Sequence, residues 1–94
     1  MTPLQKHYQA VASLGCLACK ADGFGHVDPS LHHPYGRKGQ NEWLVIPLCH
    51  THHQGHFNGE HYDWKVSVHP WRRRFESRYG SADFMLAEVA RLIK

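Results

Sequence analysis

The chain has 94 residues, which corresponds to one small domain over residues 1–94 with room for only a modest core. Hydrophobic residues make up 41 % and charged residues 20 %, a composition typical of globular rather than disordered proteins. The longest apolar run, residues 43–49, is too short to span a membrane, and the N-terminus has no apolar segment typical of a signal peptide. A net charge of +3 slightly favours a polyanionic partner.

Capping and turn residues divide the chain into short elements. Thr2 and Pro3 suit the start of a helix, Gly15 suits its end, and Pro34 ends an extended segment because proline has no backbone N–H. In chain order we predict a helix over 2–15, a tight turn at 16–19, a loop at 20–30, a short strand at 31–33, a loop at 35–41, a strand at 43–48, a turn or short helix at 49–56, a loop at 57–63, a strand at 64–69, a helix over 70–80 and a last helix capped by Ser81. This order indicates a small α+β domain.

Apolar spacing predicts which helix faces are buried. Trp71, Phe75 and Tyr79 lie four residues apart and form one stripe that we expect to face the core. The other residues expected to be mostly buried are Trp43, Trp64, Phe84, Leu86, Val89, Ala90 and Ile93.

Ten histidines and three cysteines are the most informative part of the composition. An odd number of cysteines without a secretory context indicates metal binding rather than disulfides. Cys16-x-x-Cys19 and Cys49-x-x-His52 are two half-sites with the spacing of zinc ligands, so we predict a structural Zn²⁺ on these four residues. His53 is the alternative fourth ligand.

Several histidines remain once this zinc site is closed. They are His32, His33, His53, His56 and His69. Because most of them flank the zinc ligands in the sequence, they suggest a second, open site for a divalent cation. Such a site can activate water or stabilise a leaving oxygen.

The same residues carry a resemblance. Leu31-His32-His33-Pro34, a glycine-containing loop, a strand ending in Pro47-Leu48-Cys49, and then His52-His53 resemble the motif of the HNH nucleases. The segment Val66–His69, followed by an arginine-rich helix ending in Arg78-Tyr79-Gly80, is similar to a phage subgroup, the recombination-enhancement (Ref) nucleases, which act on DNA with the recombinase RecA. The resemblance implies a ββα-metal core with a zinc knuckle and flanking helices.

The resemblance also implies roles for individual residues. His33 is expected to be the general base, and His32 and His53 ligands of a catalytic Mg²⁺, Mn²⁺ or Zn²⁺, with His53 closing the motif. His69 is a rival second or third ligand. Asn41 is the nearest candidate for the asparagine of the motif, with Glu42 as an alternative. The expected reaction is DNA phosphodiester hydrolysis leaving 5′-phosphate and 3′-hydroxyl ends.

Basic residues follow the histidines. They are Arg37 and Lys38 between the two strands of the motif, and Arg72, Arg73, Arg74 and Arg78 on the helix after His69. We expect them to contact DNA phosphates, two or three of the four helix arginines at a time, with low sequence specificity. The expected partners are DNA and, through the resemblance, RecA-coated DNA. The expected state is a monomer in the cytoplasm of a bacterial or phage-infected cell.

Two other functions are compatible with parts of this pattern. One is a non-catalytic, zinc-stapled DNA-binding module in which the additional histidines are incidental. The other is a zinc-dependent hydrolase of a small substrate. The His32-His33-Pro34 run argues against the first function, and the basic helix argues against the second.

Overall fold

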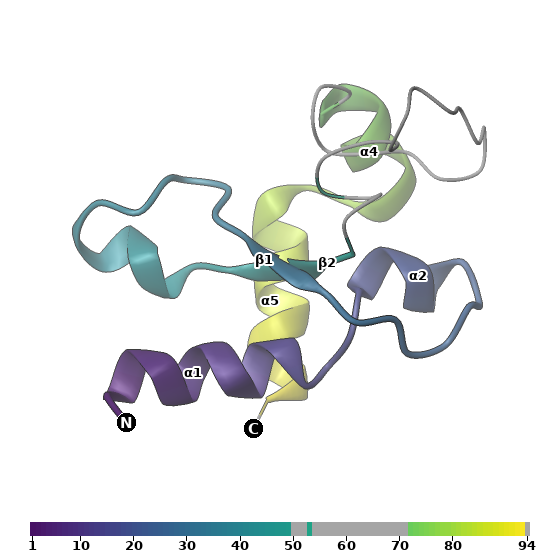
Figure 1. The fold of residues 1–94 in the computed structure, drawn as a ribbon. Coiled ribbons are helices and arrows are strands. Elements are labelled where there is room, and N and C mark those ends of the chain that lie inside the picture. The colour runs from purple at the N-terminus through teal and green to yellow at the C-terminus, as the bar shows by residue number, and fades with distance from the viewer. Residues whose placement is uncertain (50–52, 54–71, 94) are drawn as a thin grey trace, which may run out of the picture.

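A computed structural model describes residues 1–49, 53 and 72–93 of the chain. Within these ranges the elements are α1 (Pro3–Ala12), α2 (Leu17–Ala21), β1 (Ser30–His32), the 3-10 helix η1 (Gly39–Trp43), β2 (Ile46–Leu48), α4 (Arg72–Tyr79) and α5 (Ala82–Leu92). The paired strands β1 and β2 lie in the middle of the molecule, with α1 below them and α5 behind (Figure 1). The predicted α+β class is confirmed.

The start of α1 follows from its capping residues. The Thr2 hydroxyl accepts a hydrogen bond from the Gln5 backbone N–H at 3.1 Å, and the Gln5 side chain accepts one from the Thr2 N–H at 2.9 Å. This reciprocal pair satisfies two N–H groups that a helix otherwise leaves without partners. The predicted start is therefore confirmed. The helix ends at Ala12, slightly before the predicted end at Gly15.

The sheet is antiparallel; β1 lies one residue earlier than predicted, and β2 is shorter than the sequence predicts. Ser30 pairs with Leu48, and His32 pairs with Ile46. The second strand was expected to begin at Trp43, but Trp43 is the last residue of η1. A side chain of α1 explains the difference. His7 Nε2 lies 2.8 Å from the Trp43 carbonyl oxygen, so this oxygen accepts its hydrogen bond from the histidine rather than from a neighbouring strand.

Three of the helices pack on the sheet. α1, α2 and α5 all contact β2, whose residues are buried throughout. The main core consists of Cys16, Ala18, Cys19, Ile46, Leu48, Cys49, Phe75, Tyr79, Ala82 and Met85, and a second cluster consists of Val11, Val45 and Val89. The predicted inward face of α4 is confirmed at its two described members, Phe75 and Tyr79. Trp43 is only partly buried.

The predicted inward face of α5 is partly wrong. Ala82, Met85 and Val89 are its buried residues, whereas Phe84 is 56 % exposed and Ala90 is also exposed. The buried residues lie three and four positions apart, so they share one side of the helix. Among the other residues expected there, Leu86 and Ile93 are only partly buried.

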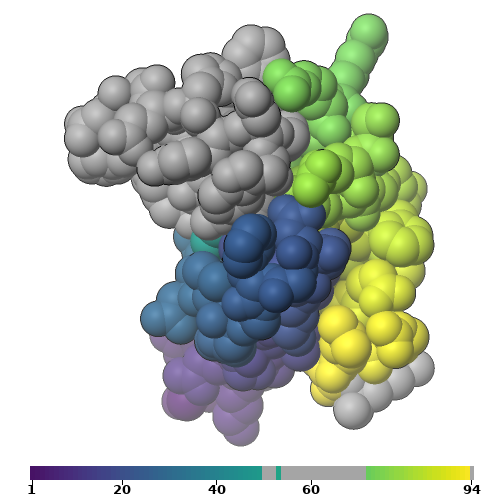
Figure 2. All heavy atoms as spheres, turned by 90° about the vertical axis from the view of Figure 1, so that its right-hand side faces the viewer, coloured from purple at the N-terminus to yellow at the C-terminus, as the bar shows by residue number. Residues whose placement is uncertain are grey.

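A polar network joins α4 to α2. Arg78 Nη2 donates to Asp22 Oδ1 at 2.9 Å, and the Tyr79 hydroxyl donates to Asp22 Oδ2 at 2.6 Å. Burial and the hydrogen bond to Asp22 raise the pKa of the Tyr79 hydroxyl, so it stays protonated and can donate. The space-filling view shows α2, in dark blue, with the green of α4 and the yellow of α5 beside it (Figure 2). The network therefore holds the C-terminal end of α4 against the end of the cysteine-bearing α2.

Substituting Asp22→Ala should lower the free energy of unfolding by about 1–3 kcal/mol, because it leaves the partly buried Tyr79 hydroxyl without its acceptor. Chemical denaturation of the metal-loaded protein measures this loss. Asp28→Ala is the matched control, since the Asp28 carboxylate is fully exposed and lies 3.9 Å from His26 Nδ1. We expect this control to change the stability by less than about 0.5 kcal/mol. Equal stability of the two variants would contradict a role for Asp22 in holding α4.

Candidate metal centre and histidine cluster

The three cysteines meet in the core. Cys16 precedes α2 as its N-cap, Cys19 lies within α2, and Cys49 directly follows β2. Their Sγ atoms all lie within 4.8 Å of one another, and all three residues are buried. The Cys16 Sγ also accepts a hydrogen bond from the Cys19 backbone N–H at 3.4 Å, so the turn between them is held in place by the sulfur.

The arrangement suits zinc rather than a disulfide. Cys19 Sγ and Cys49 Sγ are 3.7 Å apart. Two sulfurs on a tetrahedral zinc with bonds of ~2.3 Å lie about 3.8 Å apart, whereas a disulfide needs about 2.05 Å. The hydrogen bond to Cys49 and burial raise the pKa of the Cys16 thiol, so without a cation the thiolate form is disfavoured. The cluster can therefore hold a zinc ion. The fourth predicted ligand, His52, lies outside the described residues.

Two of the predicted catalytic-ion ligands are neighbours. The rings of His32 and His53 are 4.9 Å apart and meet edge to face. His32, at the end of β1, is 7 % exposed. His53 is helical, and its N–H donates to the Cys49 carbonyl at 2.9 Å, one helical turn after the cysteine. The third candidate ligand, His69, lies outside the described residues, as do His56 and Trp64.

A serine hydroxyl orients His53. Ser30 Oγ donates to the Leu48 carbonyl at 3.1 Å and lies 2.9 Å from His53 Nδ1. Since the single hydroxyl proton goes to the carbonyl, Ser30 Oγ accepts from Nδ1–H. The lone pair of the neutral ring is then on Nε2, the arrangement found when a second hydrogen bond fixes a metal-binding histidine. The sequence showed Ser30 only as the residue before the first strand and offered no signal of this contact.

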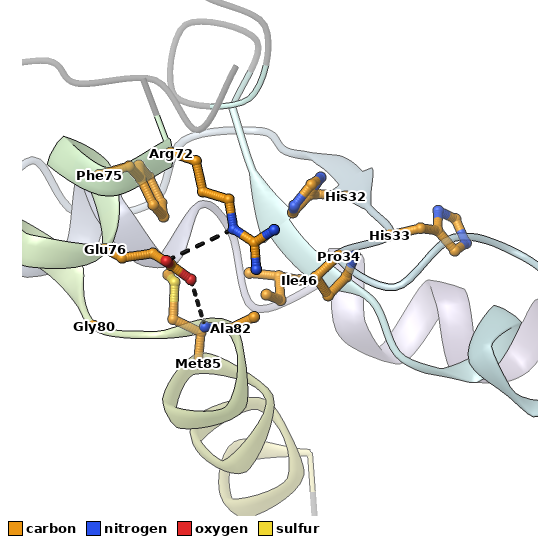
Figure 3. A pocket seen from close by; sticks show the side chains of 10 residues that line it. All are labelled: His32, His33, Pro34, Ile46, Arg72, Phe75, Glu76, Gly80, Ala82 and Met85. Atoms are coloured by element: carbon orange, nitrogen blue, oxygen red, sulfur yellow. Dashed lines mark hydrogen bonds and ion pairs between the residues drawn. The ribbon is translucent and has the colours of Figure 1, made fainter. Parts of the chain in front are cut away.

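His33 points away from His32. Figure 3 shows the His32 imidazole on the side of Arg72 and the His33 imidazole turned in the opposite direction. His33 lies against Tyr8 of α1, where its Nε2 is 3.1 Å from the tyrosine hydroxyl. Burial, with a smaller contribution from the charge of Arg37, lowers the pKa of His33, so the ring is neutral at pH 7. A neutral imidazole is the form that can accept a proton.

A small cavity adjoins these histidines. Its volume is about 90 Å³, and it is lined by His32, His33, Pro34, Ile46, Arg72, Phe75, Glu76, Gly80, Ala82 and Met85. Figure 3 shows the Arg72 guanidinium between Glu76 and His32. Glu76 lies 3.6 Å from Arg72 Nε and accepts from the Ala82 N–H at 3.2 Å, so the carboxylate is anchored at the start of α5. Arg72 is thereby directed toward the histidine side of the cavity.

The other basic residues differ in their surroundings. Arg37 and Lys38 lie exposed in the loop between β1 and η1, and Arg73 and Arg74 lie exposed on α4. Arg78 is different, because its guanidinium pairs with the Asp22 carboxylate. Its charge is therefore largely neutralised within the fold.

Asn41, the nearest candidate for an asparagine of the motif, contacts the loop that follows β1. Asn41 Nδ2 donates to the Tyr35 carbonyl at 3.2 Å, two residues beyond His33. It therefore ties η1 to the loop that follows β1. Glu42, the alternative candidate, contributes its backbone carbonyl, which accepts from the Tyr8 hydroxyl at 2.7 Å. No pattern in the sequence around Tyr8 indicates this contact.

Removing one cysteine should remove the metal and the fold together. We expect the purified protein to hold one zinc per chain at the cysteine cluster, and Cys16→Ser to lose this ion and its cooperative unfolding transition. The reason is that apparent zinc-binding free energies of about 10–16 kcal/mol account for the folding of small zinc domains. Elemental analysis and thermal unfolding measure the two effects, with His26→Ala as a control that keeps the cluster. A zinc-free Cys16→Ser protein that still unfolds cooperatively would contradict the prediction.

The chain is similar to a known protein family. A family model described as "Recombination enhancement, RecA-dependent nuclease" matches residues 2–94. No curated protein matches the chain. The matched range contains the three cysteines, the histidines His32, His33 and His53, and the arginine-rich helix. The chain therefore belongs to the family of recombination-enhancement, RecA-dependent nucleases.

Proposed function

We propose that this protein is a metal-dependent endonuclease of the HNH type that hydrolyses DNA phosphodiester bonds with low sequence specificity. The observation that carries the proposal is the meeting of His32 and His53, with ring centroids 4.9 Å apart, beside the β1–β2 hairpin of a nuclease-family protein. Two imidazoles at the end of a short hairpin, with His33 next to His32 in sequence, match the histidines of the HNH motif that the sequence resembles.

The ligand side of the site consists of His32 and His53, with His69 as a further candidate. Their donor set fits a divalent transition metal well, because imidazole nitrogen is a common ligand of zinc and related ions. Mg²⁺ and Mn²⁺ are the other ions in the proposal. When bound, the ion supplies positive charge that stabilises the phosphate oxygens and the leaving oxygen. Ser30 orients His53 for this role through the hydrogen bond to Nδ1.

His33 is the proposed general base. Its lowered pKa keeps the imidazole neutral at pH 7, so it can take a proton from the attacking water. It projects to the other side of the strand from His32, which separates the base from the ligand residues (Figure 3).

DNA is proposed to bind across the arginine-rich face of α4. Arg72 is the innermost candidate contact, because it lines the cavity with His32. Arg73, Arg74, Arg37 and Lys38 extend the positive surface outward. These residues read phosphate charge rather than bases, which accounts for the proposed low specificity. Arg78, although part of the predicted set, is paired with Asp22 and is proposed as the weakest contributor.

The family description also indicates the partner. The name of the matched family implies dependence on RecA, so RecA-coated DNA is the proposed substrate and a bacterial or phage-infected cell the proposed setting. We propose that residues 1–94 act as a single domain and as a monomer. No helix among the described residues has the length and apolar character needed to cross a bilayer.

Cleavage should depend on His33. We expect His33→Ala to slow the nicking of RecA-coated circular DNA by about 10²–10⁴-fold, because the general base is removed, while zinc content and thermal stability change little. Gel assays with Mg²⁺ or Mn²⁺, with and without RecA, measure the rate. His26→Ala is the matched control, since His26 is an exposed histidine outside the site. Wild-type protein that binds DNA but cleaves none under any of these conditions would favour the non-catalytic DNA-binding module.

Arg72 should contribute more to DNA affinity than a paired arginine elsewhere. We expect Arg72→Ala to weaken duplex binding and to reduce the slope of log K against log[salt] by about 0.9, the value for one lost phosphate contact. Arg91→Ala is the matched control, because Arg91 is an exposed arginine paired with Glu88 on α5, as Arg72 is with Glu76 on α4. Titration of labelled duplexes of unrelated sequence at several salt concentrations gives the slopes. The same slope for both variants would place DNA on another surface.

A further inference from the structure

Tyr8 of α1 contacts the imidazole ring of His33. Its ring meets the ring of His33 edge-on, with centroids 5.8 Å apart and an interplanar angle of 84°. The hydroxyl oxygen of Tyr8 lies 3.1 Å from His33 Nε2 and 2.7 Å from the Glu42 carbonyl oxygen. One phenol therefore connects the first helix, the residue after β1 and the 3-10 helix η1.

Tyr8 has a single hydroxyl proton, and this fixes the direction of both hydrogen bonds. The Glu42 carbonyl can only accept, so the single hydroxyl proton of Tyr8 is donated to it. The hydrogen bond between Tyr8 and His33 then requires the imidazole to donate from Nε2–H. A neutral imidazole carries one proton, so the lone pair of His33 is on Nδ1.

The second nitrogen of His33 has an unusual environment. Nδ1 is buried and has no hydrogen-bond partner within the described ranges. Buried polar atoms are nearly always hydrogen-bonded in folded proteins, and an exception calls for an explanation in the chemistry of the site. A buried nitrogen that holds a lone pair and has no partner among the described residues can accept a hydrogen bond from a water that reaches it in the substrate complex.

We propose that Tyr8 is a positioning residue that holds His33 in the Nε2–H form, so that Nδ1 is the atom that takes the proton from the attacking water. The inference rests on the proposed function and adds to it the atom and the residue that orients it. Tyr8 itself does not touch the substrate. It acts through His33, and the Glu42 carbonyl holds the phenol in the orientation that this requires.

Nδ1 takes a proton from water as the water oxygen forms a bond to phosphorus, and the bond from phosphorus to the 3′ oxygen breaks. The leaving oxygen is protonated by solvent. His33 becomes an imidazolium in which both nitrogens carry protons, and Nε2–H still donates to Tyr8. The same hydrogen bond therefore serves the ring before and after proton transfer.

Alternatives within the fold are weaker. Asn41, the nearest match to the asparagine of the motif, donates to the Tyr35 carbonyl rather than to His33. His7, beside Tyr8 on α1, contacts the Trp43 carbonyl. Tyr8 is the residue for which the described structure gives a direct hydrogen bond to the His33 ring.

The test is Tyr8→Phe, which keeps the aromatic ring against His33 and removes only the hydroxyl. Tyr35→Phe is the matched control, since it removes a tyrosine hydroxyl that donates to Asp83 rather than contacting the His33 ring. Both variants are prepared as the full, zinc-loaded chain and compared by thermal unfolding. We expect Tyr8→Phe to lower kcat for cleavage of RecA-coated DNA by about 10- to 100-fold with KM unchanged, the effect typical of losing a residue that orients a functional histidine. We expect Tyr35→Phe to leave kcat unchanged.

A spectroscopic measurement separates positioning from mere structural support. Nitrogen-15 spectra of histidine-labelled protein report which ring nitrogen of His33 carries the proton, and His33→Ala identifies its signals. We expect Nε2–H in the wild-type protein and a mixture of the two forms in Tyr8→Phe. Wild-type protein protonated on Nδ1, or a Tyr8→Phe variant with wild-type kcat, would overturn the proposal. Because the spectra need no activity, failure of the proposed nuclease function would be recognised separately, by a wild-type chain that holds Nε2–H but does not cleave DNA.

Discussion

The position of the candidate site depends on the three buried cysteine thiols. Cys19 lies on α2 and Cys49 directly after β2, and their sulfurs lie 3.7 Å apart, so a zinc ion shared between them would hold the helix and the strand together. His53 follows Cys49 by one helical turn, with its N–H on the Cys49 carbonyl. A zinc ion bound to the thiols would thus also fix the start of the segment that brings His53 to His32. Stability and the proposed activity therefore depend on the same residues.

The first helix has the complementary role on the other side of the hairpin. Through His7 and Tyr8 it takes up two backbone carbonyls of η1, and this keeps β2 short. The same face of the helix contacts His33. The two histidines that follow one another in sequence are thus supported by different parts of the fold. His32 is placed by the sheet and the core, and His33 is placed by the packing of α1.

Ion pairs with acidic residues determine which arginines of α4 are available to a partner. These arginines look equivalent in the sequence, but Asp22 neutralises Arg78, and Glu76 directs Arg72 toward the histidine side of the cavity. Exposed ion pairs contribute little to stability, so the Arg72–Glu76 pair matters more for where it places the guanidinium than for its strength. The side chain of Asp22 is only 9 % exposed, so its pair with Arg78 contributes mainly to the stability of the fold.

The sequence by itself determined the features that depend on near neighbours along the chain. The helix cap at Thr2 acts within three residues, and the structure confirms it. The predicted tight turn at 16–19 is instead the start of α2, which is capped by Cys16 and continues to Ala21 in the predicted loop. Tertiary structure alone decided that β2 begins at Ile46, that Met85 rather than Phe84 is buried, and that Tyr8 meets His33 across 25 positions of sequence. The physical reason is that capping and ligand spacing depend on local backbone geometry. Which helix face is buried, and which carbonyl a distant side chain reaches, depends on how the helices pack on the sheet.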